Sequence, residues 1–162
     1  MAGIFNKEVE VYLSFATLRG TIATRHARLS DHLLTFDETF TLKNVKSGRG
    51  TSSLSAETAL VYKRLVILVA DLGSDGQDTV DAQLFRVERE PHRVIVGAGP
   101  FWVRGDIHIV RGGDLETVGL GTTRFVPLTG ATFVGQEGAE PATFIVNREH
   151  IGCLLIDPRE TV

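Results

Sequence analysis

A series of short sequence blocks that recurs in the second half of the chain limits the folds available to its 162 residues. Residues 18–22 (LRGTI) align with residues 103–107 (VRGDI). Three more pairs follow in the same order: Leu29 and Leu34 with Leu115 and Leu120, residues 40–42 with 125–128, and residues 60–64 with 144–148. Because chance seldom keeps four pairs in order at near-constant spacing, the sequence predicts two copies of one structural unit.

Apolar and polar residues alternate within each copy, as in a strand with one buried face. Val9, Val11 and Leu13 occupy every second position, and Ile107 and Ile109 repeat this pattern in the second copy. Successive side chains of a strand point to opposite faces, so this period places the apolar residues on one side. The predicted fold class is mainly β: a tandem duplication of a small bent-sheet or open-barrel domain with one short helix per unit.

Two local signals refine this prediction. The apolar phase shifts near residues 16–17, which predicts a turn or bulge there. Ser30 and Asp31 are typical of a helix N-terminus, so a single helical turn is expected to begin at Ser30. Its counterpart over residues 114–121 is expected to be less regular, because glycine disfavours helix.

The predicted boundaries place a first β unit over residues 1–72 and a second over residues 92–162. Residues 73–91 form a linker that opens with the loop sequence GSDGQD and has apolar residues at helical spacing further on, so it can hold a short helix. Units of about 70 residues bury only a modest fraction of their surface, so the two are expected to pack together.

Composition favours a globular protein without a membrane span, at 43% hydrophobic and 23% charged residues. The longest apolar run, residues 65–70, is far shorter than a bilayer requires. Charges follow closely on the first apolar residues, so we expect no signal peptide and a cytoplasmic protein. The single cysteine, Cys153, lies in an apolar run and is predicted to be a packed core thiol.

No motif predicts catalysis, a metal site or a cofactor. Asp106 and His108 lie two apart on one strand, but a third ligand at a recognisable spacing is missing, so solvent-facing polar residues are the better interpretation. Turn glycines explain the two Gly-x-Gly pieces, at residues 97–99 and 119–121, better than a phosphate loop does. The prediction is therefore that the chain is not an enzyme and carries no cofactor.

A group of basic residues is the one candidate binding feature. Its members are Arg19, Arg25, His26, Arg28, Lys46 and Arg49 in the first unit, with Arg104 in the second. Arginine at loop edges suits carboxylates, phosphates or acidic protein surfaces. Solvated charge on the polar side of a sheet explains the same residues, and both interpretations stay open here.

Three blocks resemble a family of small uncharacterised bacterial domains with an RLSD, FxPLT and VNRxHI pattern. They are residues 28–33 (RLSDHL), 125–129 (FVPLT) and 146–151 (VNREHI), so the first unit keeps one block and the second keeps two. The family supplies a class of domain and no activity.

The strand order is also remotely similar to that of Sm-like barrels. That likeness implies a bent five-stranded sheet and ring assembly through strand pairing. The Arg-Gly pair that Sm proteins use on RNA is absent, since residues 63–65 are KRL and residues 148–150 are REH. This departure weakens an RNA-binding prediction.

Two function classes follow. The favoured one is a non-enzymatic interaction or assembly protein that binds a protein partner, or further copies of itself, through sheet edges and arginine-bearing loops. The alternative is an Sm-like RNA-binding or other nucleic-acid-binding module. The net charge of −3 favours the first, because non-specific nucleic-acid binders usually carry a basic excess.

Overall fold

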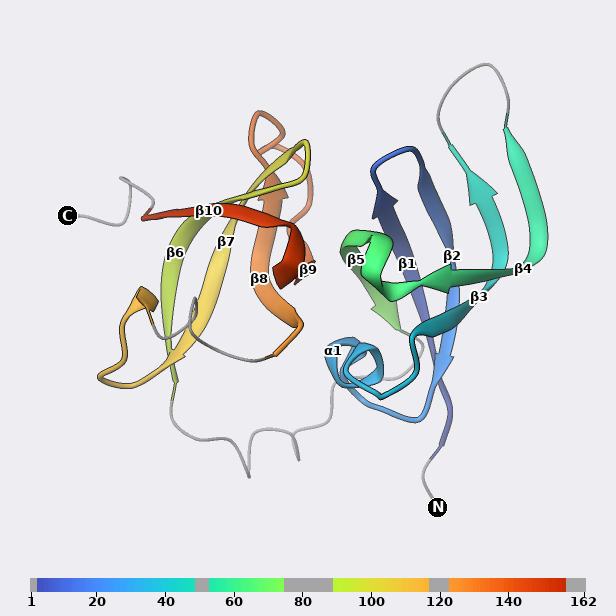
Figure 1. Cartoon of the computed structure of the whole chain (residues 1–162), viewed down its shortest axis with the longest axis horizontal. Helices are drawn as coiled ribbons and strands as arrows, with labels where there is room; N and C mark the ends of the chain where they lie inside the picture. Colours follow the sequence, from blue (N-terminus) through green and yellow to red (C-terminus); the bar gives the residue numbers. More distant parts are fainter. Residues whose placement is uncertain (1–2, 49–52, 75–88, 117–122, 157–162) are drawn as a thin grey trace.

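The computed structural model describes residues 3–48, 53–74, 89–116 and 123–156, and within them ten antiparallel strands form one open sheet (Figure 1). The strands are β1 Phe5–Leu13, β2 Thr17–Thr24, β3 Thr39–Ser47, β4 Leu54–Tyr62, β5 Val66–Ser74, β6 Arg89–Ala98, β7 Phe101–Val110, β8 Phe125–Phe133, β9 Ala142–Asn147 and β10 Ile151–Ile156. The helical elements are α1 Leu29–Leu33 and the 3₁₀ turns η1 Lys63–Leu65 and η2 Arg148–His150. The mainly β class predicted from the alternation is confirmed.

The first five and the last five strands have the same order within the sheet. In the first half (residues 3–74) the order is β5-β1-β2-β3-β4, and in the second half (residues 89–156) it is β10-β6-β7-β8-β9. The halves join where β5 pairs with β9, so one continuous sheet replaces the two separate sheets expected from the repeat. We call this β5–β9 pairing the seam; Figure 1 shows it between the green and orange-red strands.

Pairing registers also agree between the halves. Val9 lies opposite Gly20 in the β1–β2 hairpin, and Val94 lies opposite Gly105 at the equivalent place in the β6–β7 hairpin. The next pairings, β2–β3 and β7–β8, each contain a register shift just beside that glycine. The bulge residue of β3 is Asn44 and that of β8 is Gly130, and both have a positive φ, of 53° and 56°. A bulge bends the strand and increases its twist, so both halves bend at the same place.

The glycines at these bends allow two strands to approach closely. A Cβ on Gly20 would lie 2.7 Å from the side chain of Leu42 and 2.7 Å from the carbonyl oxygen of Lys43. A Cβ on Gly105 would lie 3.1 Å from the Cβ atoms of Leu128 and Ala131, which is less severe. Glycine is therefore required at the first bend for steric reasons.

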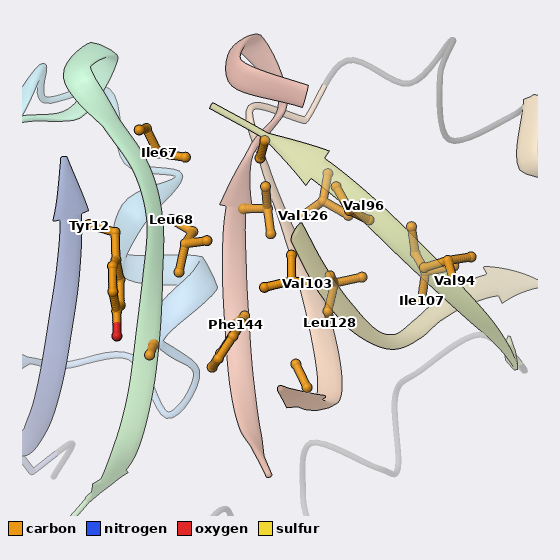
Figure 2. Packing of buried hydrophobic residues seen from close by; sticks show 14 of the residues in the cluster. Tyr12, Ile67, Leu68, Val94, Val96, Val103, Ile107, Val126, Leu128 and Phe144 are labelled. Atoms are coloured by element: carbon orange, nitrogen blue, oxygen red, sulfur yellow. The ribbon is translucent and has the colours of Figure 1, made fainter. Parts of the chain in front are cut away.

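Apolar side chains gather into two clusters, and each cluster takes residues from both halves. Tyr12 and Leu68 of the first half pack in the cluster dominated by the second, beside Phe144 and Val126 (Figure 2). In return, Phe125 and Ile145 of the second half pack in the cluster dominated by the first. Because β5 and β9 share a sheet, their alternating side chains enter both clusters and bind the halves together.

The turn predicted near residues 16–17 is present, since the Leu13 amide donates to the Ala16 carbonyl oxygen between β1 and β2. The predicted helix begins earlier than expected: its N-cap is Arg28, two residues before Ser30, and the Arg28 side chain makes no capping hydrogen bond. In the second half residues 115–116 have helical backbone, and residues 117–122 lie outside the described part. The proposed linker helix also lies outside it, while Gly73 and Ser74 extend β5 and residues 89–91 begin β6.

The prediction of a core thiol at Cys153 is wrong, because Cys153 is exposed on β10. An apolar run indicates burial only where another layer or strand covers it, and β10 is the last strand of the sheet. No helix in the described part of the chain has the length and hydropathy needed to cross a membrane.

Candidate functional site

The sheet ends in two open edges, β4 and β10. Within the described residues, β4 pairs only with β3, and β10 pairs only with β6. The outer backbone N–H and C=O groups of an edge strand are free to pair with another chain. These two edges are therefore the candidate interaction surface of the chain.

Both edges carry exposed apolar side chains. On β4, Leu54 and Leu60 are 71% and 58% exposed, and on β10, Leu155 and Ile156 are 46% and 60% exposed. Proteins usually protect open edges with charges, proline or short strands, and an apolar edge left uncovered tends to associate. No charged residue occurs in β10 (IGCLLI), and Glu57 is the one charged residue of β4.

The seam is an example of two such edge strands that are paired with each other and buried. Val69 of β5 lies directly opposite Ile145 of β9, and their side chains are 0% and 1% exposed. Aromatic rings extend the contact, with ring centroids 5.1 Å apart for Tyr12 and Phe133 and 5.0 Å apart for Phe133 and Phe144. Such tilted and edge-on pairs add to the stabilisation from burial.

Asn147 fastens one end of the seam. Its side chain is fully buried, and its Nδ2 donates to the carbonyl oxygens of Lys63 (3.2 Å) and Val66 (2.9 Å) on the other half. Its Oδ1 accepts from the backbone N–H of Glu149 at 3.0 Å. One side chain thus satisfies three backbone groups around η1 and η2, which fixes where β5 begins relative to β9.

The predicted basic residues do not form one patch. Arg19 and Lys46 are cross-strand partners near the start of β2, and they line a hollow of about 350 Å³ with Glu10, Tyr12, Thr17 and Gly48. Arg25, His26 and Arg28 follow the far end of β2, and a strand rises about 3.3 Å per residue, so roughly 20 Å separates the two groups. Arg49 lies outside the described residues.

Within the first group, acidic neighbours compensate the charge of Arg19. Its guanidinium contacts the carboxylate of Glu8 at 2.8 Å and that of Glu10 at 3.7 Å. The hydrogen bond to Glu8 raises the pKa of Arg19 further. In the second half, Arg104 is nearly buried and forms an ion pair with Glu137. Because Glu137 lies in the loop between β8 and β9, Arg104 holds this loop against β7.

A basic group that sequence analysis missed lies beside the seam. It consists of Lys63 on η1, Arg124 just before β8 and Arg148 on η2. Arg124 is close enough to repel the charge of Lys63, and its carbonyl oxygen accepts from the Arg148 amide. Its guanidinium contacts the Glu149 carboxylate at 3.8 Å. The Nζ of buried Lys63 donates to the carbonyl and hydroxyl oxygens of Thr35, and burial lowers the pKa of Lys63. The three residues come from segments far apart in the sequence, so no local pattern could have revealed the group.

His32 on α1 lies beside this region, and its pKa is lowered from the ordinary value. Burial lowers the pKa of His32, repulsion from His26 and Lys63 lowers it further, and Asp37 opposes the shift. A histidine whose pKa is lower in the folded state binds fewer protons there than in the unfolded state. The contribution of His32 to stability is therefore fully present above the pKa that His32 has in the unfolded chain. This contribution is lost as the pH falls from that value to the pKa of His32 in the folded chain. We expect the free energy of unfolding to fall as the pH drops below about 6.5.

Urea unfolding of the wild type and of His32→Gln at pH 7.5 and at lower pH checks this. The substitution is expected to make the decline shallower, because the glutamine amide does not titrate in this range. Equal declines in the two proteins would contradict a role for His32.

The residues weighed as metal ligands have protein partners. A ring nitrogen of His108 hydrogen-bonds the hydroxyl of Thr129 at 2.7 Å, and Asp106 forms an ion pair with Arg93 at 3.4 Å. In the described ranges, no group of three or more His, Cys, Asp or Glu residues is placed to hold a metal ion.

Comparisons with protein-family models, with curated proteins and with solved structures gave no match for this chain. Of the features described above, the open edges of the sheet are the ones that point to a function.

Proposed function

We propose that this chain is a non-enzymatic assembly protein that binds other protein strands at the open edges of its sheet. The observation that carries the proposal is the pair of apolar edges, β4 and β10, in a sheet whose interior seam is an edge-to-edge contact of the same kind. Strand addition gives affinity through backbone hydrogen bonds and specificity through alternate side chains, so it needs no catalytic group.

A tandem duplication explains why the chain carries such edges, and we include it in the proposal. Equal strand orders, equal hairpin registers and bulges beside Gly20 and Gly105 support it. A duplicated unit that pairs with its twin at one edge still has the corresponding edges open at both ends. The nucleic-acid alternative has less support, because the basic residues are divided between the two ends of β2 and Arg104, which is nearly buried and paired with Glu137.

Substitution of lysine for exposed apolar residues at the edges tests the proposal. Leu60→Lys on β4 and Leu155→Lys on β10 place a charge where a partner strand would dock, which is a natural way to block edge pairing. Light scattering coupled to size-exclusion chromatography measures the mass of the purified protein. We expect the wild type to exceed the mass of one chain and each variant to lose affinity by roughly tenfold or more.

Val110→Lys is the matched control. Val110 is 50% exposed, close to the exposure of Leu60 and Leu155, but it ends β7, which is inside the sheet. It should leave the mass unchanged. A wild-type protein that stays a single chain at high concentration and binds no other protein of its host would overturn the proposal.

A further inference from the structure

From the registers of the sheet we infer that the partner is a second copy of this chain, whose β10 adds antiparallel to β4 of the first in the register of the seam. This inference rests on the proposed function and deepens it by naming the occupant of the edges. It requires that β10 correspond to β5 and that β4 correspond to β9.

The correspondence of β10 with β5 follows from their inner neighbours. Val69 of β5 lies opposite Val11, and Leu154 of β10 lies opposite Val96, with the same sequence offset between the halves in both strands. Each strand also skips one residue at its start, Ile67 in β5 and Gly152 in β10. Position and irregularity therefore agree.

The correspondence of β4 with β9 follows in the same way. Leu42 of β3 lies opposite Ala59, and Leu128 of β8 lies opposite Phe144. The Lys63 amide donates to the Glu38 carbonyl oxygen just after β4, and the Arg148 amide makes the same bond to Arg124 after β9. Ala59, and not Leu60 as the sequence blocks suggest, takes the place of Phe144.

The seam then predicts the pairs between copies. At the seam, Leu68, Val69, Ala70 and Asp71 lie opposite Val146, Ile145, Phe144 and Thr143. Transferred by the two correspondences, Cys153, Leu154, Leu155 and Ile156 of one copy lie opposite Val61, Leu60, Ala59 and Thr58 of the next.

The side chains fit this arrangement. Leu60, which corresponds to buried Ile145, would enter the partner's core beside Leu154, and the exposed Cys153 would take the buried place of Leu68. None of the four pairs contains a charge, since Ile156 and Thr58 stand where the seam has Asp71 and Thr143. The two edges differ, so the contact is head-to-tail, and repetition gives a ring or a filament with the same register.

Cysteine cross-linking tests the register, since Cys153 is the one cysteine of the chain. In Val61→Cys the new thiol faces Cys153 of the next copy, and directly opposed residues of antiparallel strands have Cα atoms about 4.5–5.5 Å apart, within disulfide range. Mild oxidation should give disulfide-linked chains on a denaturing gel. The control Leu60→Cys points to the other face and should cross-link roughly tenfold less.

A second pair guards against misfolding of Val61→Cys, because Val61 is buried. Thr58→Cys and Ile156→Cys, combined with Cys153→Ser, place both thiols at exposed positions that are predicted to be opposite each other. Cross-linking of this variant supports the same register independently.

The outcomes separate the inference from the proposed function. Wild-type chains linked through Cys153 to Cys153 would show a two-fold β10–β10 contact and overturn the inference. An assembly of higher mass in which neither designed pair cross-links also overturns it, while edge-mediated assembly stands. A wild-type protein that remains a single chain and binds no other protein would overturn both the inferred register and the proposed function.

Discussion

Replacing Asn147 by alanine is expected to lower the free energy of unfolding by about 2–4 kcal/mol, because buried backbone groups then lose their partners. Its Nδ2 donates to the carbonyl oxygens of Lys63 and Val66 in buried hydrogen bonds, and its Oδ1 accepts from the amide of Glu149 in a part-buried one, while Asn147 itself is fully buried. Alanine can replace none of these bonds. The lost hydrogen bonds lie at the seam, where the first half meets the second.

Urea denaturation at one fixed protein concentration measures the effect of Asn147→Ala. Asn6→Ala is the control, because Asn6 is exposed on β1, and surface substitutions usually change stability by less than about 0.5 kcal/mol. A change at Asn147 as small as the one at Asn6 would mean that the three backbone groups do not depend on this side chain.

Gly20→Ala is expected to cost about 3 kcal/mol, since a single added methyl group forces β2 and β3 apart. Its Cβ would lie 2.7 Å from the Lys43 carbonyl oxygen, and a backbone atom within a paired strand cannot move aside as the end of a side chain can. The neighbouring bulge at Asn44, with its positive φ, holds that carbonyl in place.

Thermal or urea unfolding of three glycine variants gives the comparison. Gly48→Ala meets nothing within 4 Å and should be close to neutral, while Gly105→Ala, with contacts of 3.1 Å, should fall between the two. If Gly20→Ala proved no more harmful than Gly48→Ala, the close approach of β2 and β3 would not be a requirement of the fold.

The exposed apolar residues of β10 lie on an open edge of the sheet, where a second chain could cover them. The apolar composition of β10 predicted a buried environment for this segment, but Cys153 and Leu155 are exposed in the chain alone. At the seam, β9 covers the corresponding residues of β5. Cys153 is therefore wrongly predicted as a core residue of one chain, and in the proposed assembly it is buried by the next.

Strand positions were readable from the sequence because they depend on local order. The burial of Val9 and Val11 follows from a period of two, and the phase shift near residues 16–17 marks the turn between β1 and β2. The bends beside Gly20 and Gly105 were not predicted, because they depend on which strand pairs with β2 and with β7. The basic residues were visible in the sequence, but their grouping was not. Arg19 and Arg25 are close in sequence, yet Arg19 lies near the start of β2 and Arg25 follows its far end.

The sequence by itself determined the mainly β class, the strand alternation and the turn near residues 16–17, since each depends on residues within a few positions of one another. Only the tertiary structure decided that β5 pairs with β9, that Asn147 fastens this seam and that β4 and β10 are left open. The physical reason is that backbone hydrogen bonds between distant strands are made by groups every residue carries, so they leave no signature in side-chain order.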